Sequence, residues 1–116
     1  MMTRRHLLAG AALLALPSRQ ALAGEVAATE ALLALLPDRN AAAPLGATWI
    51  QQKPQQPGAV LQSLQQRLGI ADARKMRDAI AEDFRNGAIV KIEGWQIART
   101  QAELCALAYF AKSGGL

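Results

Sequence analysis

The hydrophobic pattern changes period abruptly at Asn86-Gly87, and this change limits the fold more than any other feature of the chain. Over residues 71–86 the apolar residues recur at helical spacing, which predicts an amphipathic helix. The inner stripe of this helix would consist of Ala73, Met76, Ile80 and Phe84. After the Asn-Gly stop signal, residues 88–98 alternate between apolar and polar side chains and predict a β-hairpin.

The register of this hairpin follows from its turn. Glu93-Gly94 suits a tight two-residue loop, which pairs Ile92 with Trp95 and Val90 with Ile97. These four apolar side chains then share one face. Because an isolated hairpin is marginal in water, we expect this face to pack on the helices. Trp95 is then either a core anchor or a contact residue for a partner.

The last predicted helix, residues 101–112, is apolar nearly all round. Thr100 and Glu103 have the spacing of a capping box, in which each side chain bonds the other residue's backbone amide. Such a helix is either the centre of the fold or partly covered by another protein, and Leu107 and Phe110 are candidate contacts in the second case. Cys105 lies in the middle of this helix, and we expect it to be a buried apolar residue.

Two further helices are predicted, at residues 25–36 and 59–68. The second would turn Val60, Leu61, Leu64 and Leu68 inward. Residues 41–58 contain three prolines and four glutamines, so they are predicted to be mostly irregular, with at most a helical turn at 46–52 that holds Trp49 against the core. The fold class is therefore mainly α: a single small domain, residues 24–116, of about four helices with a short β-hairpin before the last helix.

Residues 1–23 have the parts of an export signal peptide: the arginine pair Arg4-Arg5, a short apolar run, and the site Ala21-Leu22-Ala23. The segment around the pair resembles the twin-arginine (Tat) motif. The apolar run is about half as long as a membrane span, so no stable membrane anchor is expected. We predict export to the periplasm by the Tat translocase and cleavage after Ala23. A Sec signal and a buried N-terminal helix are the alternatives.

The formal net charge of +4 is concentrated in this leader, since three of the 13 Lys and Arg residues precede Gly24. The remaining ten basic residues stand against nine Asp and Glu, and this near-neutral balance argues against nucleic acid as a partner. The alternative function is DNA binding. Two successive helices and a hairpin resemble a winged helix, in which Arg74, Lys75 and Arg77 would lie on the second helix.

Residues that usually carry catalysis are scarce. The one histidine is His6, in the leader, so His-dependent triads and His-based metal sites are not expected after residue 23. Asp78, Glu82 and Asp83 fall among arginines on the outer face of residues 71–86, which favours solvated ion pairs over acid–base catalysis. We expect a protein that is not an enzyme and that holds no cofactor or metal.

Residues 83–107 resemble the C-terminal signature of small Tat-signal-bearing proteins of proteobacteria. In that signature D-F, a glycine, a hydrophobic strand and G-W precede T-x-x-E-x-x-A-L. The matching residues are Asp83, Phe84, Gly87, Val90, Gly94, Trp95, Thr100, Glu103, Ala106 and Leu107. Such proteins resemble the cofactor-free small subunits associated with periplasmic dehydrogenases. The resemblance implies an accessory role beside a larger redox protein.

The export route leads to a similar expectation. The Tat pathway carries folded proteins, often because a cofactor is inserted first, yet no cofactor ligand set follows residue 23. Either the chain folds too fast for Sec, or it escorts a partner that lacks a signal. We therefore expect a non-catalytic small subunit or Tat escort of a larger redox enzyme; a stand-alone periplasmic protein is the alternative. The candidate interface residues are Trp49, Trp95, Leu107 and Phe110.

Overall fold

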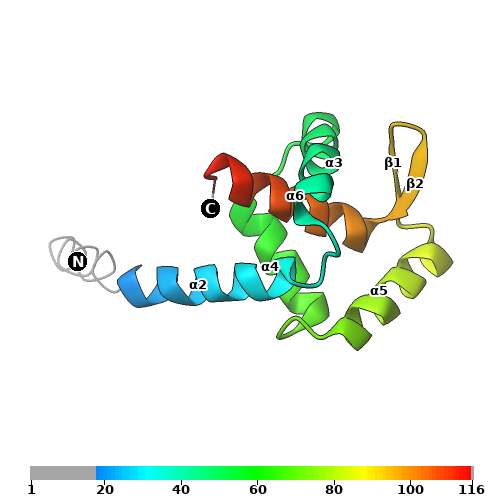
Figure 1. Cartoon of the computed structure of the whole chain (residues 1–116). Coiled ribbons are helices and arrows are strands. Elements are labelled where there is room, and N and C mark those ends of the chain that lie inside the picture. Colours follow the sequence, from blue (N-terminus) through cyan, green and yellow to red (C-terminus); the bar gives the residue numbers. More distant parts are fainter. Residues whose placement is uncertain (1–17, 116) are drawn as a thin grey trace, which may run out of the picture.

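Helices dominate the fold, and one short hairpin precedes the last helix (Figure 1). The computed structural model describes residues 18–115, with side chains from residue 24 onward. Its elements are α2 (Ser18–Leu33), α3 (Arg39–Gln52), α4 (Pro57–Leu68), α5 (Ala73–Asn86), β1 (Ile89–Ile92), β2 (Trp95–Ala98) and α6 (Arg99–Ser113). The predicted fold class is confirmed. The described residues hold one helix more than the four predicted segments, because residues 39–52 are helical.

The last helix, α6, forms the centre of the molecule. Every other described helix and both strands contact it, and Figure 1 shows it crossing the middle of the fold. Leu104, Ala106 and Leu107 are at most 1% exposed, and Phe110 is also buried. A helix that is covered on all sides needs no polar face, which explains its Ala- and Leu-rich composition.

The helix α3 corrects the prediction that residues 41–58 are mostly irregular. Its first turn is capped by Asp38, whose Oδ1 accepts from the backbone amides of Asn40 and Ala41, at 3.1 Å each. Pro44 lies inside the helix and removes one backbone donor. The Thr48 hydroxyl donates to the carbonyl oxygen of Pro44 at 3.2 Å. The sequence prediction gave the prolines too much weight, because tertiary packing against α6 outweighs the loss of one helical bond.

The contact of α3 with α6 depends on small residues. The buried face of α3 consists of Ala42, Ala43, Gly46 and Trp49. At Gly46 the two backbones come so close that a methyl group would overlap the carbonyl group of Cys105. A residue larger than glycine at this position would therefore push the two helices apart.

We predict that Gly46→Ala lowers the free energy of unfolding by about 3 kcal/mol, since neither backbone can move without disturbing the core. Gly58→Ala is the matched control, because Gly58 also lies in a helix, and nothing would contact the added methyl group. The control should be neutral or stabilise by up to about 1 kcal/mol. Urea denaturation measures both values. Equal stability of the two variants would show that α3 does not pack on α6 at this point.

The hairpin has the predicted register. Ile92 pairs with Trp95 and Val90 with Ile97. The turn residues Glu93 and Gly94 have φ values of 51° and 86°, as a type I′ turn requires. The expectation that the whole apolar face packs on the helices is only partly right. Ile92 is fully buried, whereas Trp95 beside the turn is 72% exposed and is therefore not a core anchor.

The two helices α4 and α5 differ in how deeply they are buried. On α4 the predicted inner side chains Val60, Leu61, Leu64 and Leu68 are all buried. On α5 the side chains of the predicted inner stripe are less buried than expected. Met76 and Ile80 are half-buried, and Ala73 and Phe84 are exposed. No residue of α5 is fully buried, because this helix lies at the edge of the molecule.

The helix α2 begins earlier and ends earlier than the predicted 25–36. It includes Ala21–Ala23, and its first buried side chain among the described ones is Thr29. Its N-terminal part and the hairpin lie at opposite ends of the molecule (Figure 1). The arginine pair Arg4-Arg5 lies outside the described residues. Among residues 18–115, no helix has the length and apolarity needed to cross a membrane.

Candidate functional site

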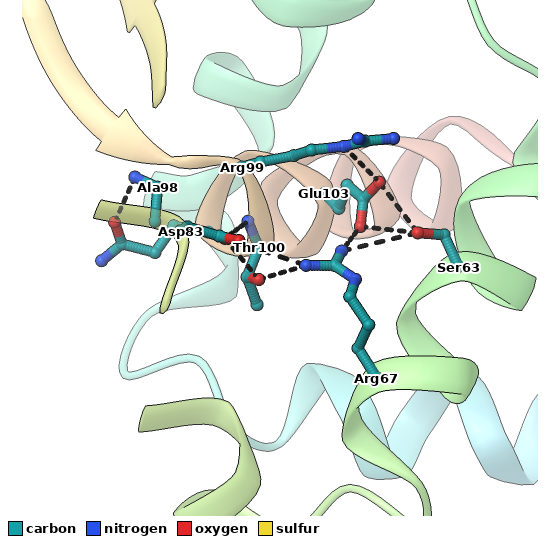
Figure 2. Close-up of polar contacts among 8 residues, drawn as sticks. Ser63, Arg67, Asp83, Ala98, Arg99, Thr100 and Glu103 are labelled. Atoms are coloured by element: carbon teal, nitrogen blue, oxygen red, sulfur yellow. Dashed lines mark hydrogen bonds and ion pairs between the residues drawn. The ribbon is translucent and has the colours of Figure 1, made fainter. Parts of the chain in front are cut away.

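A buried polar network joins three helices at the centre of the fold (Figure 2). The helix α4 contributes Ser63 and Arg67, α5 contributes Asp83, and α6 contributes Thr100 and Glu103. The first two residues lie one helical turn apart and therefore point to the same side of α4. The hydrogen bonds between these helices join residues that are 17 to 40 positions apart in the sequence.

Glu103 is the innermost member of the network. Its side chain has no solvent exposure. The Ser63 hydroxyl lies 3.1 Å from each carboxylate oxygen. Arg67 forms an ion pair with Oε1, and the Nε of Arg99 lies 3.3 Å from Oε2. A buried carboxylate needs such partners, since an unpaired charge in the interior costs several kcal/mol.

Asp83 binds the N-terminal end of α6 from a neighbouring helix. Its Oδ2 accepts from both the amide and the hydroxyl of Thr100, at 2.7 Å each. A carboxylate at this place satisfies a free amide of the first helical turn and suits the helix dipole. Arg67 donates to the Thr100 hydroxyl oxygen, and its Nη1 lies 3.8 Å from the Asp83 carboxylate.

This arrangement corrects two sequence predictions. The capping box is not formed by Thr100 and Glu103, because α6 begins two residues earlier than predicted, at Arg99. Instead the Gln101 side chain accepts from the amide of Ala98 at 2.9 Å. Asp83 is not part of a solvated ion-pair face, since its side chain is only 13% exposed. Asp78 and Glu82 are exposed as predicted.

Two cations and two carboxylates meet in this network. Burial lowers the pKa of Arg67, the Asp83 carboxylate opposes this shift, and the nearby Arg99 adds to it. Each carboxylate is bonded within the network. The geometry therefore holds α4, α5 and α6 together.

We predict that Glu103→Gln lowers the free energy of unfolding by about 3 kcal/mol, because it leaves the charges of Arg67 and Arg99 without their shared carboxylate. Glu30→Gln is the control. Glu30 also pairs with an arginine, Arg39, but on the surface, at 3.0 Å, and its loss should change stability little. Thermal and urea denaturation compare the two variants. A stable Glu103→Gln chain would mean that the network contributes nothing to the fold.

Cys105 is buried, as predicted. Burial raises the pKa of its thiol to about 11. The thiol is therefore protonated at neutral pH, which is the unreactive form. It lines one side of a cavity beside α6.

This cavity has a volume of about 220 Å³. Met76 and Ile80 line it from α5, Ile97 from β2, and Leu104 and Cys105 from α6. The rest of its lining comes from Gln101 of α6, Leu45 of α3 and the segment after α2, Leu35, Leu36 and Pro37. Two half-buried side chains of α5 thus border an apolar hollow, and one of them, Met76, also packs against the core.

Two aromatic residues on α5 and β2 are exposed. Phe84 follows Ile80 by one helical turn and is 46% exposed. Trp95 precedes Ile97 by two residues on the same hairpin face and is 72% exposed. Neither side chain lines the cavity.

The four candidate interface residues therefore divide into two groups. Trp49, Leu107 and Phe110 are buried within the chain itself, at 3%, 0% and 7% exposure. A partner could reach them only if the fold opened. Trp95 is the one member of the set that is accessible.

The sequence prediction missed the roles of Ser63 and Arg67. One signal was present, because Glu103 lies in an otherwise apolar helix and a buried acid requires a cation from elsewhere. Which arginine would supply it could not be predicted, since the choice depends on how the helices pack. Residues 18–115 contain no group of three or more His, Cys, Asp or Glu side chains placed to hold a metal ion.

In comparisons with known proteins, no family model, no curated protein and no solved structure matches this chain. The function is therefore argued from the residues and their geometry.

Proposed function

We propose that this chain is an exported, non-catalytic accessory protein that reaches the periplasm through the Tat pathway and docks on a larger redox enzyme as a small subunit or escort. The observation that carries the docking role is the exposure of Trp95 on the hairpin, at 72%. Tryptophan is among the residue types most enriched at interface hot spots.

The polar network supports the non-catalytic part of the proposal. Its carboxylates and hydroxyl groups are bonded to one another across three helices. The Cys105 thiol is protonated and buried. These groups contribute to stability.

The leader supports the export part of the proposal. Residues Gly24 to Ala27 are exposed. The cleavage site Ala21–Ala23 precedes them, nearer the N-terminus of α2. Helix ends open locally at little cost. A signal peptidase would therefore reach the site without unfolding the core.

One observation favours a second candidate function. The order α4, turn, α5 and hairpin is that of a winged helix, and Arg74 and Arg77 of α5 are exposed. Asp78 and Glu82 are exposed on the same helix and would repel phosphate groups. Salt-dependent retention of the purified chain on duplex DNA would favour this candidate over the accessory role.

We predict that replacing Arg4 and Arg5 by Lys leaves the precursor in the cytoplasm, since the Tat translocase recognises the arginine pair. A second double variant, Arg74→Lys with Arg77→Lys, carries the same chemical change on α5 and should be exported normally. Cell fractionation and N-terminal sequencing report location and cleavage, and the exported form should begin at Gly24. Export of the first variant, or export in a strain without Tat, would contradict the proposal.

Alanine substitutions of the two tryptophans should separate an effect on partner binding from an effect on the free energy of unfolding. Trp95→Ala should change the free energy of unfolding by about 0.5 kcal/mol or less, because the side chain is mostly in solvent. Trp49→Ala should cost about 3–5 kcal/mol, because Trp49 is buried. Affinity purification of the tagged chain from periplasm should recover a stoichiometric redox enzyme, and Trp95→Ala should weaken that recovery. The accessory role fails if the chain recovers no enzyme and its deletion leaves every periplasmic dehydrogenase exported and active.

A further inference from the structure

A cavity distinct from the one beside Cys105 lies where the end of α3, the start of the hairpin and the start of α6 meet. Its volume is about 410 Å³, which falls within the roughly 300–1,000 Å³ of typical small-molecule sites. Lys53 lines it just after α3, Lys91 lines it from β1, and Arg99 lines it from the first position of α6. The helix α3 contacts β1, and Figure 1 shows the hairpin beside this helix. We call this hollow the basic cavity.

The charged side chains of the basic cavity all have the same sign. They are Lys53, Lys91 and Arg99, and of the described residues that line the cavity none is acidic. This differs from the chain as a whole, because ten basic and nine acidic residues follow residue 23. A cavity along α5, by contrast, has three carboxylates in its lining as well as two cations. A cleft lined by positive charge alone concentrates anions.

Two of the three cations are free to meet a ligand. The Nε of Arg99 lies 3.3 Å from Oε2 of Glu103, which offsets part of its charge (Figure 2). Lys53 and Lys91 are exposed, and within residues 24–115 neither takes part in an ion pair. The Glu93 carboxylate, two residues after Lys91, lies 3.4 Å from the Thr48 hydroxyl and does not line the cavity. About two positive charges therefore remain uncompensated.

Each lysine also has a local explanation, and together these do not account for the cavity. Lys53 is the C-terminal cap residue of α3, where a cation suits the helix dipole. Lys91 lies on a two-stranded sheet, and lysines on edge strands oppose pairing with other chains. Both roles would be met by side chains that point into open solvent. That the two lysines line the same hollow is the observation that points to a ligand.

The remainder of the lining includes apolar groups. Trp49 lines the cavity from α3, and Ile89 and Val90 line it from β1. Trp49 is otherwise buried, whereas Ile89 is 38% exposed. A ligand that combines an anionic group with an apolar body would contact both kinds of side chain. An inorganic anion would use the charges and leave the apolar lining bare.

From these observations we propose that the basic cavity binds a small organic phosphate monoester, with its phosphate group facing Lys53 and Lys91 and its apolar body on Ile89 and Trp49. A phosphate monoester carries a charge of about −1.5 to −2 at neutral pH, whereas a carboxylate carries about −1. The larger charge matches the two free lysines, and lysine is a common phosphate-binding residue. The site goes beyond the accessory function and requires neither export nor a partner protein.

The test uses the purified full-length chain and isothermal titration calorimetry with four probes. Phenyl phosphate carries both the phosphate group and an apolar ring. Benzoate has the ring and a single charge, inorganic phosphate lacks the ring, and benzyl alcohol lacks the charge. We expect phenyl phosphate to bind at least about tenfold more tightly than each of the others. Added salt should weaken its binding, because the lysines are exposed.

Substitutions in the cavity provide the matched comparison. Lys53→Gln and Lys91→Gln should each weaken phenyl phosphate binding by about tenfold. Lys112→Gln removes the same charge at the opposite end of α6, outside the cavity, and should leave the affinity unchanged. Ile89→Ala should weaken binding of phenyl phosphate but not of inorganic phosphate. Arg99 is left in place, since it also bonds Glu103. The exposed lysine variants should unfold at the wild-type urea concentration, which confirms that the fold is kept.

The source of the phosphate group is tested with phosphatidylcholine vesicles that contain or lack phosphatidic acid, whose headgroup is also a phosphate monoester. Lysine-dependent binding of free phenyl phosphate assigns the site to a soluble ester, and lysine-dependent binding of the phosphatidic acid vesicles alone assigns it to a lipid headgroup. No binding of either, equal binding of phenyl phosphate and benzoate, or an equal loss in all three lysine variants would overturn the proposal. Lysine-dependent retention on duplex DNA without monoester binding would overturn it as well.

Discussion

A carboxylate without solvent exposure must find its partners inside the protein, and Glu103 imposes this requirement on the whole fold. It lies in the helix that every other described element contacts. Apolar packing around an Ala- and Leu-rich helix would tolerate several rotations of its neighbours. Hydrogen bonds and ion pairs to particular oxygens tolerate far fewer, because they are directional. Ser63 and Arg67 therefore fix how α4 lies against α6.

The same network accounts for the unusual placement of α5. Asp83 holds this helix against the first turn of α6, because it accepts hydrogen bonds from the amide and the hydroxyl of Thr100. Because Asp83 follows Ile80 by three residues, the apolar stripe of α5 lies about 60° away from the side that makes this contact. Met76 and Ile80 of this stripe consequently line the cavity that Ile97 of β2 also lines. The Asp83–Thr100 contact thus stabilises the start of α6 and also sets which way the apolar stripe of α5 faces.

The fold was predictable from the sequence where local pattern and tertiary structure agree. The Glu93-Gly94 turn fixed the hairpin register, and the apolar spacing on α4 identified its buried side chains. The prediction of an irregular stretch in place of α3 was wrong because it treated Pro44 as decisive, whereas Asp38 caps the helix and Gly46 allows close packing on α6. The pairing of Arg67 with Glu103 depends on packing between distant segments, and no local pattern encodes it. For the same reason the periodicity of α5 identified its apolar stripe but not the depth of its burial.

The order of the helices along the chain has a consequence for synthesis on the ribosome. The central helix α6 follows all the other described elements along the chain. Until α6 has been translated, the helices that pack on it lack their common partner, and Arg67 lacks the buried carboxylate of Glu103. We therefore expect stable tertiary structure to form only after translation of α6.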